Sequence, residues 1–241
     1  AQNADVVISM VSNTPDVEQV LLGEHGVIST IQPDALVIDM STISPAASQA
    51  IYEKLTAKQV AFLDAPVSGG DVGAINATLT IMVGGDETAF QRAFPIFECL
   101  GKTATHIGAS GAGQICKACN QILVASNLMG VCEALGLAAA NDIELGPLVT
   151  ALGGGAAQSW QLDNLGPAIL NNQLAPGFMI ELLAKDLRIV KEALDAAGTV
   201  ADSTAKAKKL FDGLMDEGDG RLGTQALVKA YEQLGQVKIR R

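Results

Sequence analysis

The chain has 241 residues, of which 49% are hydrophobic and 17% charged, and its formal net charge is −10 at pH 7. This length suits one large domain or two ordinary domains with a sizeable core. The acidic balance, without clusters of Lys or Arg, argues against a nucleic-acid partner or an anionic membrane surface.

The first part of the chain alternates predicted strands with predicted helices. Short apolar runs rich in β-branched residues predict strands at 5–10, 36–40, 61–65, 79–83 and 104–107. Helix-start signals at Thr14-Pro15 and Ser44-Pro45, and apolar periodicity over 87–100, predict the helices between them. Strands separated by helices imply a doubly wound, Rossmann-like sheet.

After Gly108 the strand signal disappears and helical periodicity takes over. Predicted helices cover residues 112–141, 145–152, 160–170, 180–197, 203–217 and 225–234. Glycine- and proline-rich turns separate them. We therefore predict an α/β protein in two domains, a partial doubly wound sheet in 1–110 and an all-helical domain in 111–241, joined by the long helix.

Residues 122–140 are the most apolar stretch and approach the length of a membrane span. The stretch contains Asn127 and Glu133, so we expect instead a helix buried between domains or subunits, and with it a homo-oligomer. The first residues show neither the basic region nor the cleavage pattern of a signal peptide.

The four cysteines include a Cys-x-x-Cys pair, Cys116 and Cys119. One interpretation is a redox pair or half of a zinc site. We favour two small apolar residues on a helix, because no second Cys or His pair supplies the remaining ligands and the chain has only 2 histidines. We expect no metal site, and a reduced, cytoplasmic compartment.

A predicted buried strand ends in the sequence Pro66-Val-Ser-Gly-Gly70. Consecutive glycine amides can approach a carboxylate or phosphate oxygen closely, and the Ser68 hydroxyl adds another donor. Ser68, Gly69 and Gly70 are therefore candidates for binding a small anion. The competing interpretation is a plain tight turn after a strand.

Lys117, Asn120 and Gln121 share one face of the long helix, because they are spaced i, i+3 and i+4. Lys117 lies in an apolar segment, and lysine is rarely buried without a partner. Its ammonium can donate a proton and stabilise negative charge on a reacting oxygen. The two amides can orient a substrate, or can cap neighbouring backbone groups instead. A solvated lysine is the alternative for Lys117.

Four motifs, in order over nearly the whole chain, resemble the β-hydroxyacid dehydrogenase family, of the 3-hydroxyisobutyrate dehydrogenase or tartronate semialdehyde reductase type. They are Asp64-Ala-Pro-Val-Ser-Gly-Gly70, Thr78-Leu-Thr-Ile-Met-Val-Gly-Gly85, Gly111-Ala-Gly-Gln-Ile-Cys-Lys117 with Asn120, and Pro176-Gly-Phe178 with Lys185-Asp-Leu187. The resemblance implies an oxidoreductase that interconverts a small β-hydroxy acid and its semialdehyde or β-oxo acid. It implies Lys117 as the catalyst and Ser68, Gly69 and Gly70 as the carboxylate site.

The same resemblance implies which residues contact a nicotinamide cofactor. Met10 and Val11, after the first predicted strand, and Thr42 would lie against the adenosine and the nicotinamide ribose. Lys185 would reach the nicotinamide end from the helical domain, with Phe178 beside the cleft. Without the resemblance, Lys185 and Asp186 would pass for an ordinary surface charge pair. The helical domain would serve substrate binding and dimerisation.

The chain departs from the family pattern in its cofactor motif. Members normally begin with a strand, a G-x-G-x-x-G turn and a helix that hold the cofactor pyrophosphate, and no such segment precedes Ala1. We expect a member that lacks its first half-Rossmann and binds dinucleotide weakly or not at all, with NAD and NADP both open.

Two single positions also depart from the family. Ala77 stands where the family usually has glycine, so we expect a local backbone adjustment. Gln121 stands where the family often has asparagine, which suggests a different substrate tail.

Two other functions fit the sequence. One is a succinic-semialdehyde-type reductase of the same family, which differs in substrate length. The other is a non-catalytic oligomerisation or ligand-binding scaffold, which the missing cofactor fingerprint would permit. A thermal-shift titration with NADH and NADPH separates an enzyme from a scaffold, because only a protein that binds the cofactor is stabilised by it.

Overall fold

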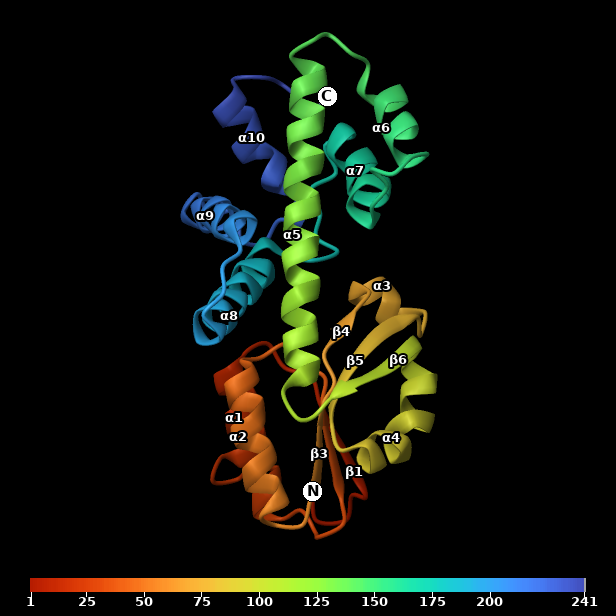
Figure 1. The fold of residues 1–241 in the computed structure, drawn as a ribbon, viewed down its shortest axis with the longest axis vertical. Coiled ribbons are helices and arrows are strands. Elements are labelled where there is room, and N and C mark those ends of the chain that lie inside the picture. The colour runs from red at the N-terminus through yellow and green to blue at the C-terminus, as the bar shows by residue number, and fades with distance from the viewer. Residues whose placement is uncertain (241) are drawn as a thin grey trace. The chain divides into compact units, whose positions relative to one another are not determined.

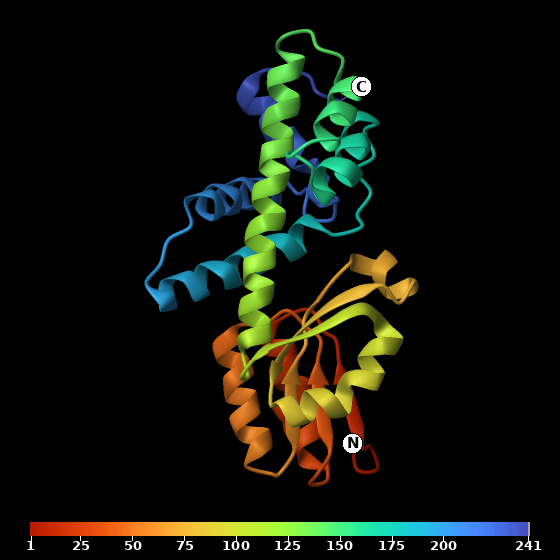
Figure 2. The same cartoon turned by 45° about the vertical axis from the view of Figure 1, so that its right-hand side comes forward.

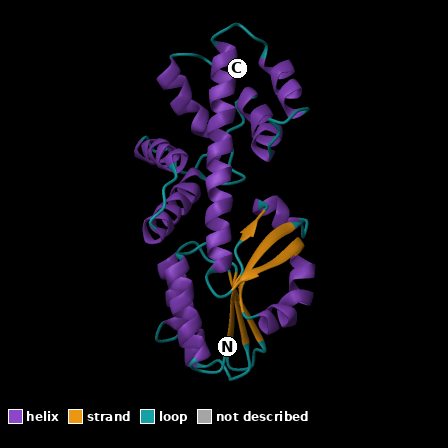
Figure 3. Cartoon of the chain, in the orientation of Figure 1, coloured by secondary structure: helices purple, strands orange, loops and turns teal. Residues whose placement is uncertain are grey.

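The structure, a computed structural model, describes residues 1–240. The chain divides into two compact units, Ala1–Cys119 and the residues from Asn120 onward. The named strands all lie in the first unit, and the named elements of the second are helices (Figure 3). The division falls inside the long helix, whereas the sequence placed the domain boundary at the start of that helix.

The first unit is built on a mixed sheet. Its strands are β1 (Val6–Ser9), β2 (Leu36–Asp39), β3 (Ala61–Asp64), β4 (Val67–Ser68), β5 (Leu79–Gly85) and β6 (Gly101–Gly108). The strand order is β1-β2-β3-β5-β4, and β6 also pairs with β5. Strands β1, β2 and β3 are parallel, with Ser9 opposite Asp39 and Asp39 opposite Asp64. Their carboxyl ends therefore meet at one edge.

Helices cover both faces of the sheet, which confirms the doubly wound prediction. The helices of this unit are α1 (Thr14–Leu22), the 3-10 turn η1 (Val27–Ser29), α2 (Pro45–Thr56), α3 (Gly70–Ile75) and α4 (Glu87–Leu100). Helices α1 and α2 lie on one face and α4 on the other (Figure 1). Side chains alternate along β2, so that Leu36 and Ile38 join the core beneath α4 while Val37 joins the core beneath α1 and α2.

The segment after β3 is more than the plain tight turn that was the competing interpretation of Ser68–Gly70. It forms the short strand β4 and the helix α3, and β5 then runs antiparallel to both β3 and β4. A parallel return requires a crossover of about a dozen residues or more, usually a helix packed on the sheet. The connection instead forms the 6-residue helix α3 and the strand β4, which pairs with β5, so the chain folds back antiparallel and the sheet becomes mixed.

The second unit is helical. Its elements are α5 (Ala112–Ala139), which begins in the first unit, α6 (Leu145–Gly153), the π-helical turn η2 (Gln161–Leu165), α7 (Gly166–Leu170), α8 (Ile180–Ala197), α9 (Asp202–Asp216), the 3-10 turn η3 (Thr224–Leu227) and α10 (Val228–Gly235). Figure 2 shows α8 and α9 joined by a short loop. The helix predicted at 160–170 begins with a π-helical turn directly before Pro167. Proline lacks an N–H and clashes with the carbonyl four residues earlier, which accounts for the wider turn.

Helix α5 contributes the central side chains of the helical core. Ala125, Leu128, Cys132 and Leu135 are buried there, packed with residues of α8 and α9. Within the described chain, α5 is the one helix long and apolar enough to cross a membrane by length and composition, with a mean hydropathy of 1.7. A core helix meets the same criteria, and the burial of these four side chains fits that role.

Candidate active site

Polar side chains form a buried network at the carboxyl ends of β1 and β2. The hydroxyls of Ser9 and Ser41 both donate to Asp39 Oδ1, over 2.8 and 2.7 Å. The backbone N–H of Val11 donates to Ser41 Oγ over 2.9 Å. The loops after the two strands are therefore held by one carboxylate. In doubly wound sheets, ligands bind in the crevice outside such strand ends.

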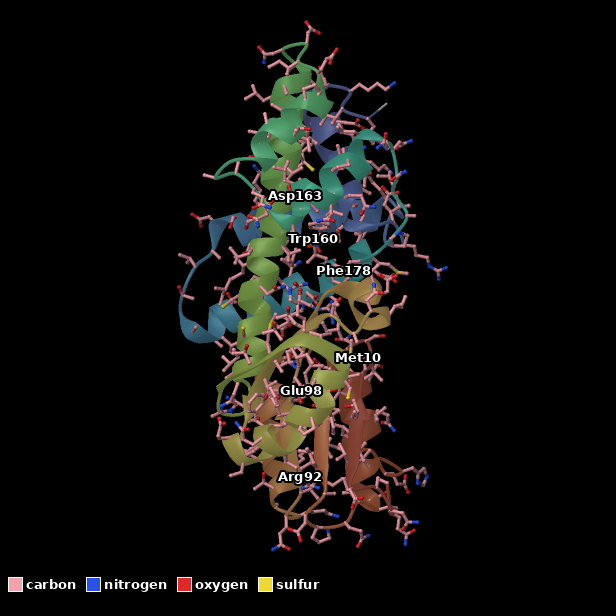
Figure 4. All side chains as sticks on the ribbon, turned by 90° about the vertical axis from the view of Figure 1, so that its right-hand side faces the viewer. Met10, Arg92, Glu98, Trp160, Asp163 and Phe178 are labelled. Atoms are coloured by element: carbon pink, nitrogen blue, oxygen red, sulfur yellow. The ribbon has the colours of Figure 1, made fainter. Side chains whose placement is uncertain are left out.

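The cofactor residues predicted in this unit lie on those two loops. Met10 and Val11 follow β1, and Thr42 follows β2. The Met10 side chain is 63% exposed (Figure 4), although it is large and apolar. The structure thus brings the three predicted residues to the same edge of the sheet.

The start of α5 is fixed to β3 by Asp64. Its Oδ1 accepts a hydrogen bond from the N–H of Gly111 over 2.7 Å, and its Oδ2 accepts one from the N–H of Gln114 over 2.9 Å. A Cβ on Gly113 would lie 2.5 Å from the Asp64 carbonyl oxygen, so only glycine allows this approach. Burial raises the pKa of Asp64 to about 6, although these hydrogen bonds from Gly111 and Gln114 oppose the rise.

The side chain of Gln114 ties the same helix start to the loop after β2. Its Oε1 accepts from the N–H of Ile43 over 3.1 Å, and its Nε2 donates to the carbonyl of Ser41 over 2.8 Å. The loops after β2 and β3 therefore both hold the first turn of α5. Lys117 stands one turn further along this helix.

Lys117 is buried, with 7% of its surface exposed. The alternative of a solvated lysine on a helix face is therefore wrong. An amine in such surroundings is able to take part in proton transfer at a reacting oxygen.

The candidate anion site occupies the junction of β4 and α3. Ser68 pairs with Thr80 in the sheet. Gly69 and Gly70 have φ angles of 133° and 64°, which side chains with a Cβ rarely adopt. The backbone here depends on glycine at both positions, as an anion cradle does.

In the second unit, predicted substrate and cofactor residues are linked by hydrogen bonds. Asn120 Nδ2 donates to Gln121 Oε1 over 2.7 Å, and Gln121 Nε2 donates to Asp186 Oδ2 over 2.6 Å. The other carboxylate oxygen, Asp186 Oδ1, lies 3.0 Å from Lys185 Nζ. The side chains of Lys185 and Asp186 are 13% and 3% exposed, so they are not an ordinary surface pair.

Phe178 directly precedes the N-cap residue of α8 in this unit. Its carbonyl accepts from the N–H of Thr224 over 2.9 Å, and its side chain packs against the helical core (Figure 4).

Sequence reasoning missed the buried polar residues that hold these candidates in place. They are Asp39, Ser41, Asp64, Gln114 and Asp186. A signal was available for two of them, since Asp39 and Asp64 each end an otherwise apolar strand. Among residues 1–240, no group of three or more His, Cys, Asp or Glu could hold a metal ion.

Family models match both units of the chain. Residues 1–108 match the NAD binding domain of 6-phosphogluconate dehydrogenase. Residues 111–231 match a model described as NAD-binding of NADP-dependent 3-hydroxyisobutyrate dehydrogenase. The second match begins at the helix start that Asp64 holds.

Curated relatives extend the similarity over nearly the whole chain. The 2-hydroxy-3-oxopropionate reductase of Escherichia coli is 39% identical over 98% of this chain and 81% of its own length. The NAD-dependent L-serine dehydrogenase of Pseudomonas aeruginosa is 38% identical over 96% of this chain and 80% of its own length. Among solved structures, 3-hydroxyisobutyrate dehydrogenase of Mycobacterium tuberculosis with L-serine has a TM-score of 0.87 at 31% identity, covering 95% of this chain and 80% of that one.

Proposed function

The chain belongs to the β-hydroxyacid dehydrogenase family, and on that premise we propose that it interconverts a small β-hydroxy acid and its semialdehyde or β-oxo acid with NAD or NADP. The relatives named above are oxidoreductases of this type. Both halves of the chain contribute, since each is similar to a nicotinamide-dependent enzyme over most of its length.

Residues at the carboxyl ends of β1 and β2 fit a nicotinamide cofactor. The buried Asp39 network fixes both loops, and the exposed apolar side chain of Met10 offers a surface for a flat ring. We assign Met10, Val11 and Thr42 to cofactor binding, and we expect Phe178 and Lys185 to contribute from the second unit. The cofactor supplies the hydride; the protein supplies binding, orientation and the proton.

The burial of Lys117 is the observation that carries the proposal. In the reducing direction its ammonium would donate a proton to the carbonyl oxygen of the substrate as hydride reaches the carbon, and in the oxidising direction the amine would take the proton back. Ser68, Gly69 and Gly70 would hold the carboxylate, and Asn120 and Gln121 would orient the rest of the substrate. Fixing the start of α5 at Asp64 and Gln114 sets where Lys117 stands in this unit.

An activity assay tests the function. The protein, as its complete gene encodes it, is mixed with NADH or NADPH and a panel containing tartronate semialdehyde, methylmalonate semialdehyde and succinic semialdehyde, and loss of the reduced nicotinamide is followed by absorbance. We expect turnover of the shorter semialdehydes. Preference for succinic semialdehyde would point to the longer-substrate reductase. No turnover, together with no thermal stabilisation by either dinucleotide, would favour the scaffold alternative.

We also propose that the enzyme is a cytoplasmic homo-oligomer whose residues 111–241 serve substrate binding and dimerisation while 1–110 serve the cofactor. Exposed large apolar side chains of the second unit support the oligomer, because an interface between subunits would remove their surface from water. They are Leu123, Leu137, Trp160 and Leu234 (Figure 4 labels Trp160). The cysteines are free thiols, which suits a reducing compartment. Light scattering that finds a monomer at every concentration would contradict the oligomer.

A further inference from the structure

Asp186 stands at the centre of the hydrogen-bonded chain that runs from Lys185 through Gln121 to Asn120. It is the buried carboxylate of the second unit within residues 1–240, with 3% of its surface exposed. One of its oxygens faces an ammonium and the other faces an amide, over 3.0 and 2.6 Å. The contacts join α5 to α8 across 65 residues of sequence.

The donors and acceptors in this chain can be assigned from chemistry alone. A lysine ammonium has donors and no acceptor, and an aspartate paired with it is an acceptor at both oxygens. The amide of Gln121 must therefore turn its NH₂ group toward Asp186. The carbonyl oxygen of Gln121 is then directed at Asn120, which must donate to it from its own NH₂ group.

Asn120 is left with a fixed orientation. Its amide is planar, so when the nitrogen donates to Gln121 the carbonyl oxygen Oδ1 points away from Gln121. We propose that Asp186 is a positioning residue which, through Gln121, makes Asn120 offer its carbonyl oxygen to the substrate as an acceptor. This inference rests on the proposed function, in which Asn120 contacts the substrate.

The orientation of Asn120 selects a class of substrate. A β-hydroxy acid with a hydroxyl or ammonium group on C2 can donate to Oδ1, whereas one with a methyl group on C2 leaves this acceptor without a partner. A site built to accept from a substrate group rejects the analogue that lacks the group. The enzyme therefore prefers 2-hydroxy and 2-amino substituted β-hydroxy acids.

Kinetics of the wild type and two Asp186 variants test the inference. For each protein, kcat/KM is measured for the enantiomers of glycerate and serine and for 3-hydroxyisobutyrate. In the wild type we expect at least about a tenfold preference for the better C2-donor acid over the methyl acid, the factor that one hydrogen bond supplies. Asp186→Asn should lose the preference. An asparagine can donate to Gln121, and the side-chain amides of Gln121 and Asn120 can then both flip by 180°. Asp186→Glu, which keeps the charge, should retain more of it.

A control variant and a second way of interrupting the hydrogen-bonded series complete the test. Asp195→Asn removes a carboxylate on the same helix that pairs with Lys191 at the surface, and its preference should equal that of the wild type. If Asp186→Asn does not fold, Gln121→Met serves instead. This variant removes the hydrogen bonds between Asp186 and Asn120, keeps the ion pair of Lys185 and Asp186, and should lose the substrate preference as well. Equal preference in the wild type and the folded variant would overturn the inference.

A readout without turnover separates this inference from the proposed function. Side-chain NH₂ resonances of Asn120 and Gln121 are compared by NMR in the wild type, Asp186→Asn and Asp195→Asn. We expect both to shift in the first variant and neither in the second. A wild type that turns over no β-hydroxy acid would refute the proposed function, and an Asn120 resonance unmoved by Asp186→Asn would refute the positioning role.

Discussion

The two units bury polar groups in different ways. In the first unit, Asp39 and Asp64 collect hydrogen bonds from serine hydroxyls and backbone amides where parallel strands end. In the second unit, the core around α5 is apolar. Asp186 is the one buried carboxylate among the described residues of that unit. Ends of adjacent strands leave backbone groups that need partners at one edge, while helices satisfy their own backbone internally. The buried carboxylates of the first unit therefore fix strand ends and the start of α5, whereas Asp186 in the second unit links α8 to α5 through Gln121.

Replacing Lys117 with alanine tests whether this residue, near the start of α5, takes part in catalysis. We expect kcat to fall by about a thousandfold, because a proton donor is lost. The melting temperature should change little, since alanine favours the helix. Steady-state kinetics and a thermal melt measure both. Activity within about threefold of the wild type would remove Lys117 from the mechanism.

Leu128→Ala tests the opposite end of the comparison, the apolar core. Leu128 is completely buried, so the variant should lose about 3 kcal/mol of unfolding free energy from lost burial and the cavity left behind. Chemical denaturation measures the loss. The kcat per folded molecule should stay close to that of the wild type, and a parallel collapse of kcat would mean that the core also shapes the site.

Asp64→Asn tests how a buried carboxylate of the first unit makes the free energy of unfolding depend on pH. The pKa of Asp64 is raised from 3.8 to about 6 on folding, so the folded protein binds more protons than the unfolded chain between these values. Stability from this group is therefore largest at low pH and falls as pH rises through that window, by up to about 3 kcal/mol. Above about pH 6 it falls no further.

The measurement compares unfolding free energies of wild type and Asp64→Asn across this range, so that titration of other groups cancels. The wild type should lose stability relative to the variant as pH rises to about 6. A difference that does not depend on pH would show that Asp64 does not titrate in this window.

Ser68→Ala should affect binding more than chemistry. Loss of one hydrogen bond to the substrate carboxylate should raise KM by about tenfold with little change in kcat. The corresponding alcohol without a carboxylate serves as the control substrate, and its KM should not change. An unchanged KM across a series of β-hydroxy acids would exclude Ser68 from the carboxylate site.

Ala77→Gly is the smallest expected effect. Ala77 has a φ of 52°, a left-handed conformation that glycine adopts more readily than alanine. Relief of that strain, partly offset by the greater freedom of glycine in the unfolded chain, should raise stability by about 0.5 kcal/mol. A small loss of stability in chemical denaturation would show that the strain is absent.

Local pattern was sufficient for most elements. The helices expected at 87–100 and 180–197 match α4 and α8 residue for residue. Amphipathic periodicity depends only on residues close together in the sequence, so it can be recognised without the fold. The same holds for the strands β1, β2 and β3 within a residue or two. The family motifs also indicated Lys117 and the glycines at the anion site, whose site roles stay predictions.

Tertiary structure alone decided the direction of β5, the strand β4 with helix α3, and the partners of the buried carboxylates. Asp64 meets Gly111 across 47 residues, and Gln121 meets Asp186 across 65. No local periodicity encodes such pairs, because strand order and helix packing bring them together. An acidic residue at the end of an apolar strand predicts that a partner is needed, and only the folded chain determines which partner it finds.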